Sequence, residues 1–366
     1  MNIHEFAKTL RLSVSTVSRA LNGYADVNAD TRAKVIEAAK RLGYTANPMA
    51  RGLRKRGTGF IAFILSPPQK NFANPFFLDL LVGIEERLRE TELKLMVVSA
   101  TSFEDEMERF RSLVEIHRVE GLIFARTRLK DPRIEYLQKH RVPFVTHGRS
   151  KSGTAAPFLD IDHEIVGHEG CARFIALGHR RIALLNTPGE LMYSHHRLEG
   201  YRRALKAAGL PLDPALVIEE DLTEEGGANG VRRLMAMAVP PTAILCGHDM
   251  MAMGAMRALH EHGQMPGRDV GVIGSDDNPL GPYMSPPLTT FTAPRVSAGR
   301  RMTELLIAAM DGAPPESLQE LWKPTLVIRA SDGPPRELAT PTSPGRRAAR
   351  PRSSPRYAAA STAKSE

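Results

Sequence analysis

A short segment near the N-terminus carries side chains that can donate hydrogen bonds to nucleic acid. In Val14-Ser15-Thr16-Val17-Ser18-Arg19-Ala20-Leu21, hydroxyls and one guanidinium lie opposite an apolar stripe of Val17, Ala20 and Leu21. Hydroxyl and guanidinium groups contact phosphates and base edges, and Arg19 can pair bidentately with guanine. For Arg19, a contact with a backbone phosphate is as well supported as this contact with guanine. These residues predict recognition of DNA.

The flanking residues predict the elements that hold this segment in place. Ile3–Leu10 has apolar residues at helical spacing. A tight break follows at residues 11–13, where Ser13 can cap the helix Val14–Leu21. Two short helices joined by so tight a turn predict a helix-turn-helix, whose second helix enters the major groove.

Two further segments complete the N-terminal region. Asn28 can cap a third helix over Thr31–Leu42, and Gly43 stands where a left-handed C-terminal cap belongs. Residues 47–57 are too few to form a stable helix alone. We therefore expect Pro48–Arg54 to become helical only against DNA and a partner subunit.

Several of these motifs together resemble the LacI/GalR (lactose-repressor/galactose-repressor) family of bacterial transcription regulators. They are Val17-Ser18-Arg19-Ala20-Leu21-Asn22-Gly23, Thr31-Arg32-Ala33-Lys34-Val35, Leu42-Gly43-Tyr44 and Asn47-Pro48. The resemblance continues to about residue 330. Within it, the loops at residues 71–77 and 147–150 are similar to those of regulators of α-glucoside utilisation. One departure is Arg11, which stands where the family usually has a small residue or glycine.

The resemblance implies a DNA-binding repressor with an N-terminal all-α domain. It implies a palindromic operator, a homodimer, and a leucine at position 53 that enters the minor groove at a central C·G step. Some family members form tetramers through a C-terminal leucine heptad, which this chain lacks. The expected DNA contacts are Ser13, Val14, Ser15, Thr16, Ser18, Arg19, Asn22, Asn47, Arg51 and Leu53.

Positive charge gathers at the two ends of the chain. The net charge is +8, and residues 1–57 hold 11 Lys and Arg against 4 Asp and Glu. Residues 331–366 hold 7 against 3, which leaves a net charge of −3 on residues 58–330. This distribution fits a small module that binds a polyanion, attached to a core with another task. Residues 331–366 are rich in Pro, Arg and Ser, so we expect a disordered basic tail.

The sequence indicates a protein that stays in the cytoplasm, associated with the nucleoid when bound to DNA. It shows no signal peptide and no apolar run long enough to span a membrane. Its 2 cysteines, Cys171 and Cys246, do not suggest a disulfide framework. No cofactor motif is recognised.

The region from residue 58 to 330 alternates apolar runs with helical stretches, which predicts parallel α/β sheets covered on both faces. The expected strands are Phe60–Leu65, Leu93–Val98, Gly121–Ala125, Val142–Thr146, Ile182–Leu185, Leu216–Ile218, Ala243–Cys246 and Val270–Ile273. The expected helices include Phe76–Arg89, His195–Ala208, Glu224–Met237 and Met250–Glu261. Two such sets predict two doubly wound subdomains facing a cleft. The resemblance implies a periplasmic-binding-protein-like core that the chain crosses near Phe158, Leu288 and Trp322.

Two groups of residues raise an enzymatic alternative. His163 and His168 are five residues apart, so they do not share a helix face as zinc ligands do, and we interpret them as surface histidines. Asp276 and Asp277 form a carboxylate pair, but no nucleophile or metal cluster accompanies them. Catalysis is therefore not expected, and no metal site is predicted.

The resemblance implies an effector site in the cleft. Arg197 is similar to the family arginine that clamps the effector, and Asp276 to its acidic partner. His248 stands where the family usually has Asn. Residues at neighbouring strand ends add Asn74, Phe76 and Arg149, and simple core packing is a nearly even alternative for Phe76. A sugar or sugar derivative is the expected effector.

Alternative functions differ in ligand and in location. A purine-type corepressor is the alternative effector. A solute-binding protein of a transporter is the alternative for the whole chain, but such a protein is exported and lacks a helix-turn-helix. The expected division is a DNA-binding domain at 1–46, a hinge at 47–57, a core at 58–330 and a tail at 331–366.

Overall fold

The computed structural model describes residues 3–21, 26–42, 44, 58–66, 75–152 and 155–336. The N-terminal helices are α1 (Ile3–Thr9), α2 (Val14–Leu21) and α3 (Ala29–Arg41). Phe6, Val17 and Val35 are fully buried between them, and Phe6 stacks on Tyr44 with ring centroids 4.2 Å apart. The predicted helix-turn-helix is thus confirmed, with a core of its own.

The turn between α1 and α2 forms in spite of Arg11. This residue has φ +52°, a left-handed conformation that favours glycine and costs a side-chain-bearing residue about 1–2 kcal/mol. Backbone bonds of Arg11 N to Lys8 O (3.1 Å) and Leu12 N to Ala7 O (3.0 Å) close the turn. Ser13 then caps α2, accepting from the backbone N of Thr16 at 3.0 Å.

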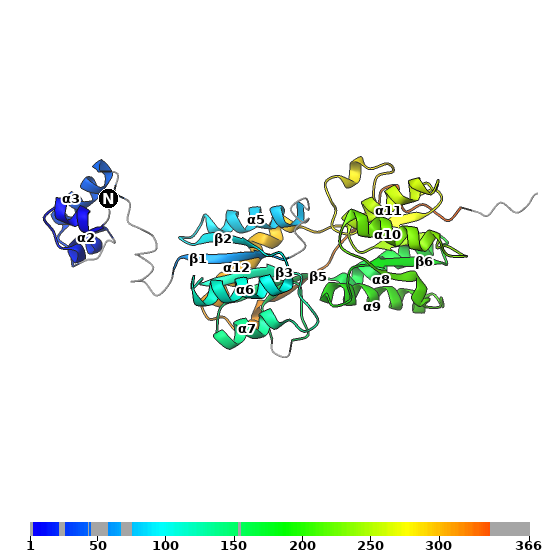
Figure 1. Cartoon of the computed structure of the whole chain (residues 1–366), viewed down its shortest axis with the longest axis horizontal. Helices are drawn as coiled ribbons and strands as arrows, with labels where there is room; N and C mark the ends of the chain where they lie inside the picture. The colour runs from blue at the N-terminus through cyan, green and yellow to red at the C-terminus, as the bar shows by residue number, and fades with distance from the viewer. Residues whose placement is uncertain are drawn as a thin grey trace, which may run out of the picture. The chain divides into compact units, whose positions relative to one another are not determined.

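The first subdomain of the core is a six-stranded parallel sheet in the order β11-β5-β4-β3-β1-β2 (Figure 1). Its strands are β1 (Phe60–Leu65), β2 (Lys94–Ser99), β3 (Gly121–Ala125), β4 (Phe144–His147), β5 (Phe158–Ile161) and β11 (Gln319–Trp322). Helices α5 (Pro75–Leu88) and α12 (Arg295–Met310) cover one face, and α6 (Phe103–Glu115) and α7 (Pro132–His140) cover the other. Alternate residues of β1 therefore enter different cores, Phe63 on the α5 side and Ile64 on the α6 side.

The second subdomain repeats this plan with a four-stranded parallel sheet in the order β7-β6-β8-β9. Its strands are β6 (Ile182–Asn186), β7 (Val217–Glu219), β8 (Ala243–Cys246) and β9 (Gly271–Ile273). Helices α8 (His163–Ala176) and α9 (Met192–Ala207) pack on one face, and α10 (Glu224–Met235) and α11 (Asp249–Glu261) on the other. Both predicted sheets are thus present, with strand ends displaced by one or two residues.

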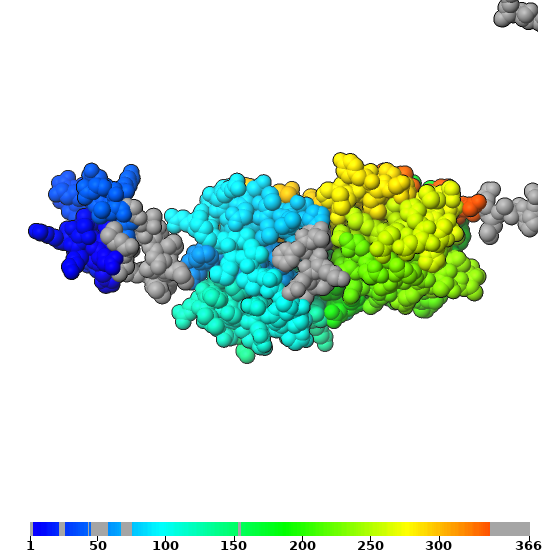
Figure 2. Space-filling model, turned by 45° about the horizontal axis from the view of Figure 1, so that its top comes forward, coloured from blue at the N-terminus to red at the C-terminus, as the bar shows by residue number. Residues whose placement is uncertain are grey.

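The chain passes between the subdomains three times, as predicted. The passages follow β5, the short strand β10 (Thr290–Phe291), and β11, after which β12 (Leu326–Val327) pairs with β10. Figure 2 shows the two subdomains adjoining, one in cyan and teal and the other in green and yellow. Among the helices described, none is both long and apolar enough to cross a membrane.

The prediction that disorder begins at Ser331 is wrong. Ser331 is fully buried: its hydroxyl donates to Val272 O at 2.7 Å and accepts from Thr289 N at 2.8 Å. Asp332 forms an ion pair with Arg173 at 2.7 Å. Polar side chains can be core residues when every donor and acceptor is paired, which a compositional argument misses. Residues 337–366 lie outside the described residues.

Candidate functional site

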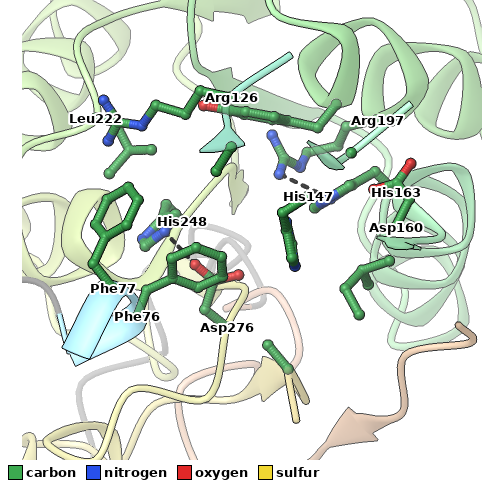
Figure 3. A pocket seen from close by; sticks show the side chains of 15 residues that line it. Phe76, Phe77, Arg126, His147, Asp160, His163, Arg197, Leu222, His248 and Asp276 are labelled. Carbon is green, nitrogen blue, oxygen red and sulfur yellow. Dashed lines mark hydrogen bonds and ion pairs between the residues drawn. The ribbon is translucent and has the colours of Figure 1, made fainter. Parts of the chain in front are cut away.

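A pocket with about 610 Å³ of empty space lies between the two subdomains. Its walls come from the carboxyl ends of the parallel strands and the loops and helices that follow them, where doubly wound sheets place their ligands. The first subdomain contributes Phe76, Phe77, Ala125, Arg126, His147, Gly148, Asp160 and Ile161, and the second contributes His163, Tyr193, Arg197, Leu222, His248, Asp276 and Ala293 (Figure 3).

Arg197 is a buried cation with incomplete hydrogen bonding. On α9, it is only 1% exposed, and its Nη1 donates to Asn186 Oδ1 at 2.8 Å. Its Nη2 lies 3.3 Å from His163 Nδ1, while its Nε is buried without a hydrogen-bond partner in the described structure. Burial lowers the pKa of Arg197, but a guanidinium remains protonated. An unmet donor on a buried charge is costly unless a ligand accepts it.

Asp276 provides the opposite charge in the same pocket. It follows β9 and has φ +108°, a conformation that L residues rarely adopt and that costs about 1–3 kcal/mol. Its backbone is held by a bond from its N to Phe291 O (3.0 Å) and by Arg295, which donates to its carbonyl. Burial alone raises the pKa of Asp276, but His248, Arg295 and Arg197 outweigh that effect and hold it below its usual value.

His248 joins Asp276 directly. The residue caps α11, and its Nε2 pairs with the carboxylate of Asp276. Its Nδ1 is buried without a hydrogen-bond partner in the described parts of the chain. His248 therefore has one nitrogen that holds Asp276 and one whose hydrogen-bonding capacity is unmet.

The first subdomain supplies aromatic rings to the pocket. Phe76 on α5 packs edge-on against Phe77 and against His147, with ring centroids 5.3 and 5.0 Å apart. Burial lowers the pKa of His147 to about 4, so this imidazole is neutral at pH 7. Figure 3 shows the two phenylalanines beside His248 and Asp276. An apolar ring next to hydrogen-bonding groups is a common arrangement in small-molecule pockets.

Arg149 does not line the pocket, although the sequence predicted it among the effector contacts. Its Nε donates to Asp160 at 2.8 Å, and Asp160 is the residue that reaches the pocket. Burial raises the pKa of Asp160 to about 6, which Arg149 partly opposes. Arg149 thus does not face the pocket itself but positions the carboxylate of Asp160, which does.

Other lining residues were missed. His163 was interpreted as a surface histidine, and this is wrong: it lines the pocket at the start of α8, and burial and Arg197 hold its pKa well below its usual value. Tyr193 was not singled out, and its buried hydroxyl has no hydrogen-bond partner in the described region. Neither residue belongs to a motif.

The predicted DNA-reading face is largely accessible. Ser13, Ser15 and Arg19 are exposed and Val14 and Thr16 half-buried, whereas Ser18 is only 9% exposed and so the least available of the set. Arg19 pairs with Asp26 at 2.9 Å, with 58% of its side chain exposed. The remaining predicted DNA contacts, Asn22, Asn47, Arg51 and Leu53, lie outside the described residues, as does Asn74, a predicted effector contact.

Comparisons with known proteins agree over nearly the whole chain. The family model for bacterial regulatory proteins of the lacI family matches residues 2–47, and that for a periplasmic binding protein-like domain matches residues 171–331. The HTH-type transcriptional regulator AglR of Rhizobium meliloti (strain 1021) is 38% identical over 342 residues, 91% of this chain and 95% of AglR.

Two solved structures share the architecture. The transcriptional regulator CelR in complex with cellobiose aligns with a TM-score of 0.71 and 30% identity over 90% of this chain and 99% of CelR. The lac repressor dimer bound to operator and the anti-inducer ONPF aligns with a TM-score of 0.77 and 26% identity over 90% of this chain and 98% of that one. With its helix-turn-helix, its two-subdomain core and relatives matched over almost their full length, this chain belongs to the LacI family of bacterial DNA-binding transcription regulators.

Proposed function

We propose that this chain is a repressor whose operator affinity is set by a small sugar or sugar derivative in the pocket between the subdomains. The observation that carries the proposal is the buried guanidinium of Arg197, which has an unmet donor in a pocket that also holds the carboxylate of Asp276. A guanidinium donates and a carboxylate accepts, so together they can bracket vicinal hydroxyls. Such charge-assisted hydrogen bonds are about twice as strong as neutral ones.

The neighbouring groups favour a sugar over a purine. Asp160, Tyr193 and His248 each carry a buried polar atom without a hydrogen-bond partner among the residues described. A ligand with many hydroxyls satisfies scattered donors and acceptors of this kind. The complex of the relative CelR with cellobiose supports the same class. Within that class, an α-glucoside is the first choice, from the resemblance of the loops.

DNA recognition is assigned to the helix-turn-helix domain at residues 1–46. Val14, Ser15 and Arg19 of this domain read base edges. Residues 47–57 form the hinge, with Leu53 in the minor groove of a palindromic operator bound by a homodimer. The core begins at residue 58 and, because of Ser331 and Asp332, extends to about residue 333. The protein acts in the cytoplasm and has no enzymatic activity.

The ligand acts by unequal affinity for two geometries of the cleft. The geometry that the inducer favours separates the two hinges of the dimer, so their helices are lost. We expect the ligand to act as an inducer, which weakens operator binding, rather than as a corepressor.

Isothermal titration of sugars into the full chain tests the site. Arg197→Ala and Asp276→Ala should each weaken binding of the wild-type effector at least about tenfold, because each removes a charged hydrogen-bonding partner. Arg202→Ala, an exposed arginine on the same helix that pairs with Glu199, is the matched control and should bind like wild type. Both site variants should still bind operator DNA. Undiminished sugar affinity in either one removes that residue from the site.

A further inference from the structure

Two loops form a small antiparallel pairing between the subdomains. Arg128, in the loop that follows β3, is bridged to Leu191, which directly precedes α9. Two backbone hydrogen bonds cross the cleft at this bridge, from Met192 N to Thr127 O (2.9 Å) and from Leu129 N to Glu190 O (3.0 Å). Because β3 belongs to the first subdomain and α9 to the second, the bridge joins the two sides of the cleft.

Charged side chains reinforce the pairing. Arg128 Nη1 donates to Glu190 Oε2 at 2.8 Å, and the guanidinium carbon of Arg128 lies 3.7 Å from the centre of the Phe103 ring. A further contact between the subdomains joins Lys151 Nζ to His195 Nε2 at 3.0 Å. The ion pair is partly exposed, with 25% of the Arg128 side chain and 57% of that of Glu190 accessible, so water can replace it when the pairing opens.

Each half of the pairing is fixed within its own subdomain. In the first, the backbone N of Arg128 donates to Asp131 at 3.0 Å, and Asp131 forms a buried ion pair with Arg133 at 2.6 Å. In the second, the backbone N of Gly189 donates to Glu219, at the end of β7, at 2.9 Å. A rotation of one subdomain against the other therefore breaks the bonds between the halves before it deforms either half.

The position of the pairing makes it sensitive to such a rotation. Figure 3 shows Arg126, two residues before Arg128, across the pocket from Asp276. The backbone N of Asp276 donates to Phe291 O in β10, where the chain passes between the subdomains. When two bodies rotate about the segments that connect them, contacts far from those segments move more than contacts beside them. The bridge therefore lies where opening of the cleft displaces the two subdomains most.

We propose that this pairing, of residues 127–129 with residues 190–192, is a latch that is closed in the effector-bound geometry of the cleft and open in the operator-bound one. The inference rests on the proposed function and specifies how the same site is regulated. The unmet polar atoms of the pocket come from both subdomains, Asp160 Oδ1 from the first and Arg197 Nε from the second. A ligand reaches both only when the two walls are close together, so the effector and the latch stabilise the same geometry.

A reversible covalent lock tests the latch. Arg128 and Leu191 form the pair whose flanking residues make the backbone bonds, and the Cα atoms of such antiparallel pairs lie about 4.5 Å apart. That spacing suits a disulfide, so the double variant Arg128→Cys, Leu191→Cys should form one under a mild oxidant and lose it under dithiothreitol. The native Cys171 and Cys246 are fully buried and do not compete for the oxidant.

Operator binding by the full chain is then measured with and without sugar, using the tightest binder among glucose, maltose, trehalose and sucrose. Without sugar, the oxidised double variant should bind operator as weakly as the sugar-saturated wild type. Adding sugar should no longer produce the change of about 5–150-fold that is expected of the wild type. Dithiothreitol should restore that response, which also shows that the variant is folded. The two single variants, treated with the same oxidant, are the matched controls and should respond to sugar like wild type.

Three outcomes overturn the latch. They are a full response to sugar in the oxidised double variant, tight operator binding by that protein without sugar, and failure of the two thiols to pair. None of them touches the proposed function, which the wild type tests by itself. If neither the wild type nor the reduced variant responds to any of the sugars, the proposed function is wrong, and the latch fails with it.

Discussion

The side chains of the pocket favour ligand binding over stability. Arg197 is a buried cation whose direct hydrogen-bond partners, Asn186 and His163, are neutral, and Asp276 is held at a positive φ. Buried charges are usually paired, and strained backbone persists only where neighbouring structure enforces it. Unpaired buried charges and strained backbone occur most often at functional sites. Arg197 and Asp276 therefore indicate a functional pocket without any comparison to related proteins.

The ion pair of Arg19 with Asp26 must open before Arg19 can contact a DNA base. The pair is exposed, so its Coulomb energy is small and DNA can displace it. Arg19→Ala should lower affinity for the matched operator by about 1–3 kcal/mol and relax discrimination at one base pair. Fluorescence anisotropy on matched and mismatched operators measures both effects. Equal weakening on the two operators assigns Arg19 to phosphate contact instead.

The sequence predicted some site residues and not others. Arg197, His248 and Asp276 belong to motifs whose order along the chain is informative. His163 and Tyr193 reach the pocket only because α8 and α9 begin beside the carboxyl ends of the two sheets. Asp160 reaches it because β5 ends at the same edge. These positions depend on packing between segments far apart in sequence. A single sequence without its fold carries no such information.

Among the elements, α8 and α9 pack closely against each other near the site. A Cβ added at Gly200 on α9 would overlap the backbone oxygen of Glu164 on α8, and one added at Gly167 on α8 would overlap that of Arg197. Glycines at both points let the two backbones approach closely. This contact fixes where α9, and so Arg197, lies relative to the sheet.

Gly200→Ala should therefore disturb both stability and ligand binding. We expect a loss of about 1–3 kcal/mol in the free energy of unfolding, the usual cost of overpacking, and weaker sugar binding because α9 is displaced. Denaturant unfolding and titration calorimetry measure the two. Glu199→Ala, the exposed preceding residue on the same helix, is the control and should change neither appreciably. Unaltered stability in Gly200→Ala would show that the helices can separate without cost.

Asp249 ties the start of α11 to the segment that carries Asp276. Its carboxylate accepts bonds from the backbone N of Asn278 (2.7 Å) and from the hydroxyl of Thr290 (2.6 Å). Burial, with help from Asp276, raises the pKa of Asp249 to about 8. The neutral form is therefore favoured in the folded chain.

This shift predicts a dependence of stability on pH. A carboxyl group whose folded pKa exceeds its unfolded value stabilises the fold most below the unfolded value, and that contribution is lost as pH rises through the folded pKa. Between pH 5 and pH 8, wild type should lose up to about 1.4 kcal/mol per pH unit relative to Asp249→Asn. Urea unfolding at several pH values measures the difference. Glu261→Gln, at the exposed far end of α11, serves as control, and a difference that stays constant with pH would contradict the account.

The elements themselves were largely predictable. β1, β3 and β8 have the predicted bounds, because buried strands in parallel sheets are continuous apolar runs flanked by turn residues. Ser331–Gly333 were missed because their burial depends on pairing with Val272, Thr289 and His179, which lie far away in sequence. The periodicity of apolar residues predicts where apolar side chains are buried. It does not predict the burial of polar residues whose hydrogen bonds are all made within the fold.

At the scale of the whole molecule, Arg295 links the proposed effector site to the first subdomain. Arg295, where the chain enters α12, donates from Nη1 to the carbonyl of Asp276 and from Nε to Asp79 on α5 at 2.8 Å. The turn that carries Asp276 is thus attached to the first subdomain. Backbone bonds from Met192 N to Thr127 O (2.9 Å) and from Leu129 N to Glu190 O (3.0 Å) add a second connection.

These connections give a ligand a physical route to the relative position of the subdomains. A sugar that satisfies Arg197 and Asp276 changes the forces on the Asp276 turn and so on Arg295. Coupling of this kind is expected to amount to about 1–3 kcal/mol, which is about a 5–150-fold change in affinity at the second site.

Measuring operator affinity with and without sugar shows directly whether the pocket controls DNA binding. The full chain is titrated onto a labelled palindromic operator from its own upstream region, with and without the tightest-binding sugar at saturation, for wild type and for Arg197→Ala. Sugar should weaken operator binding by wild type about 5–150-fold and leave operator binding by Arg197→Ala unchanged. A sugar that demonstrably saturates the wild-type core while operator affinity stays the same would contradict it.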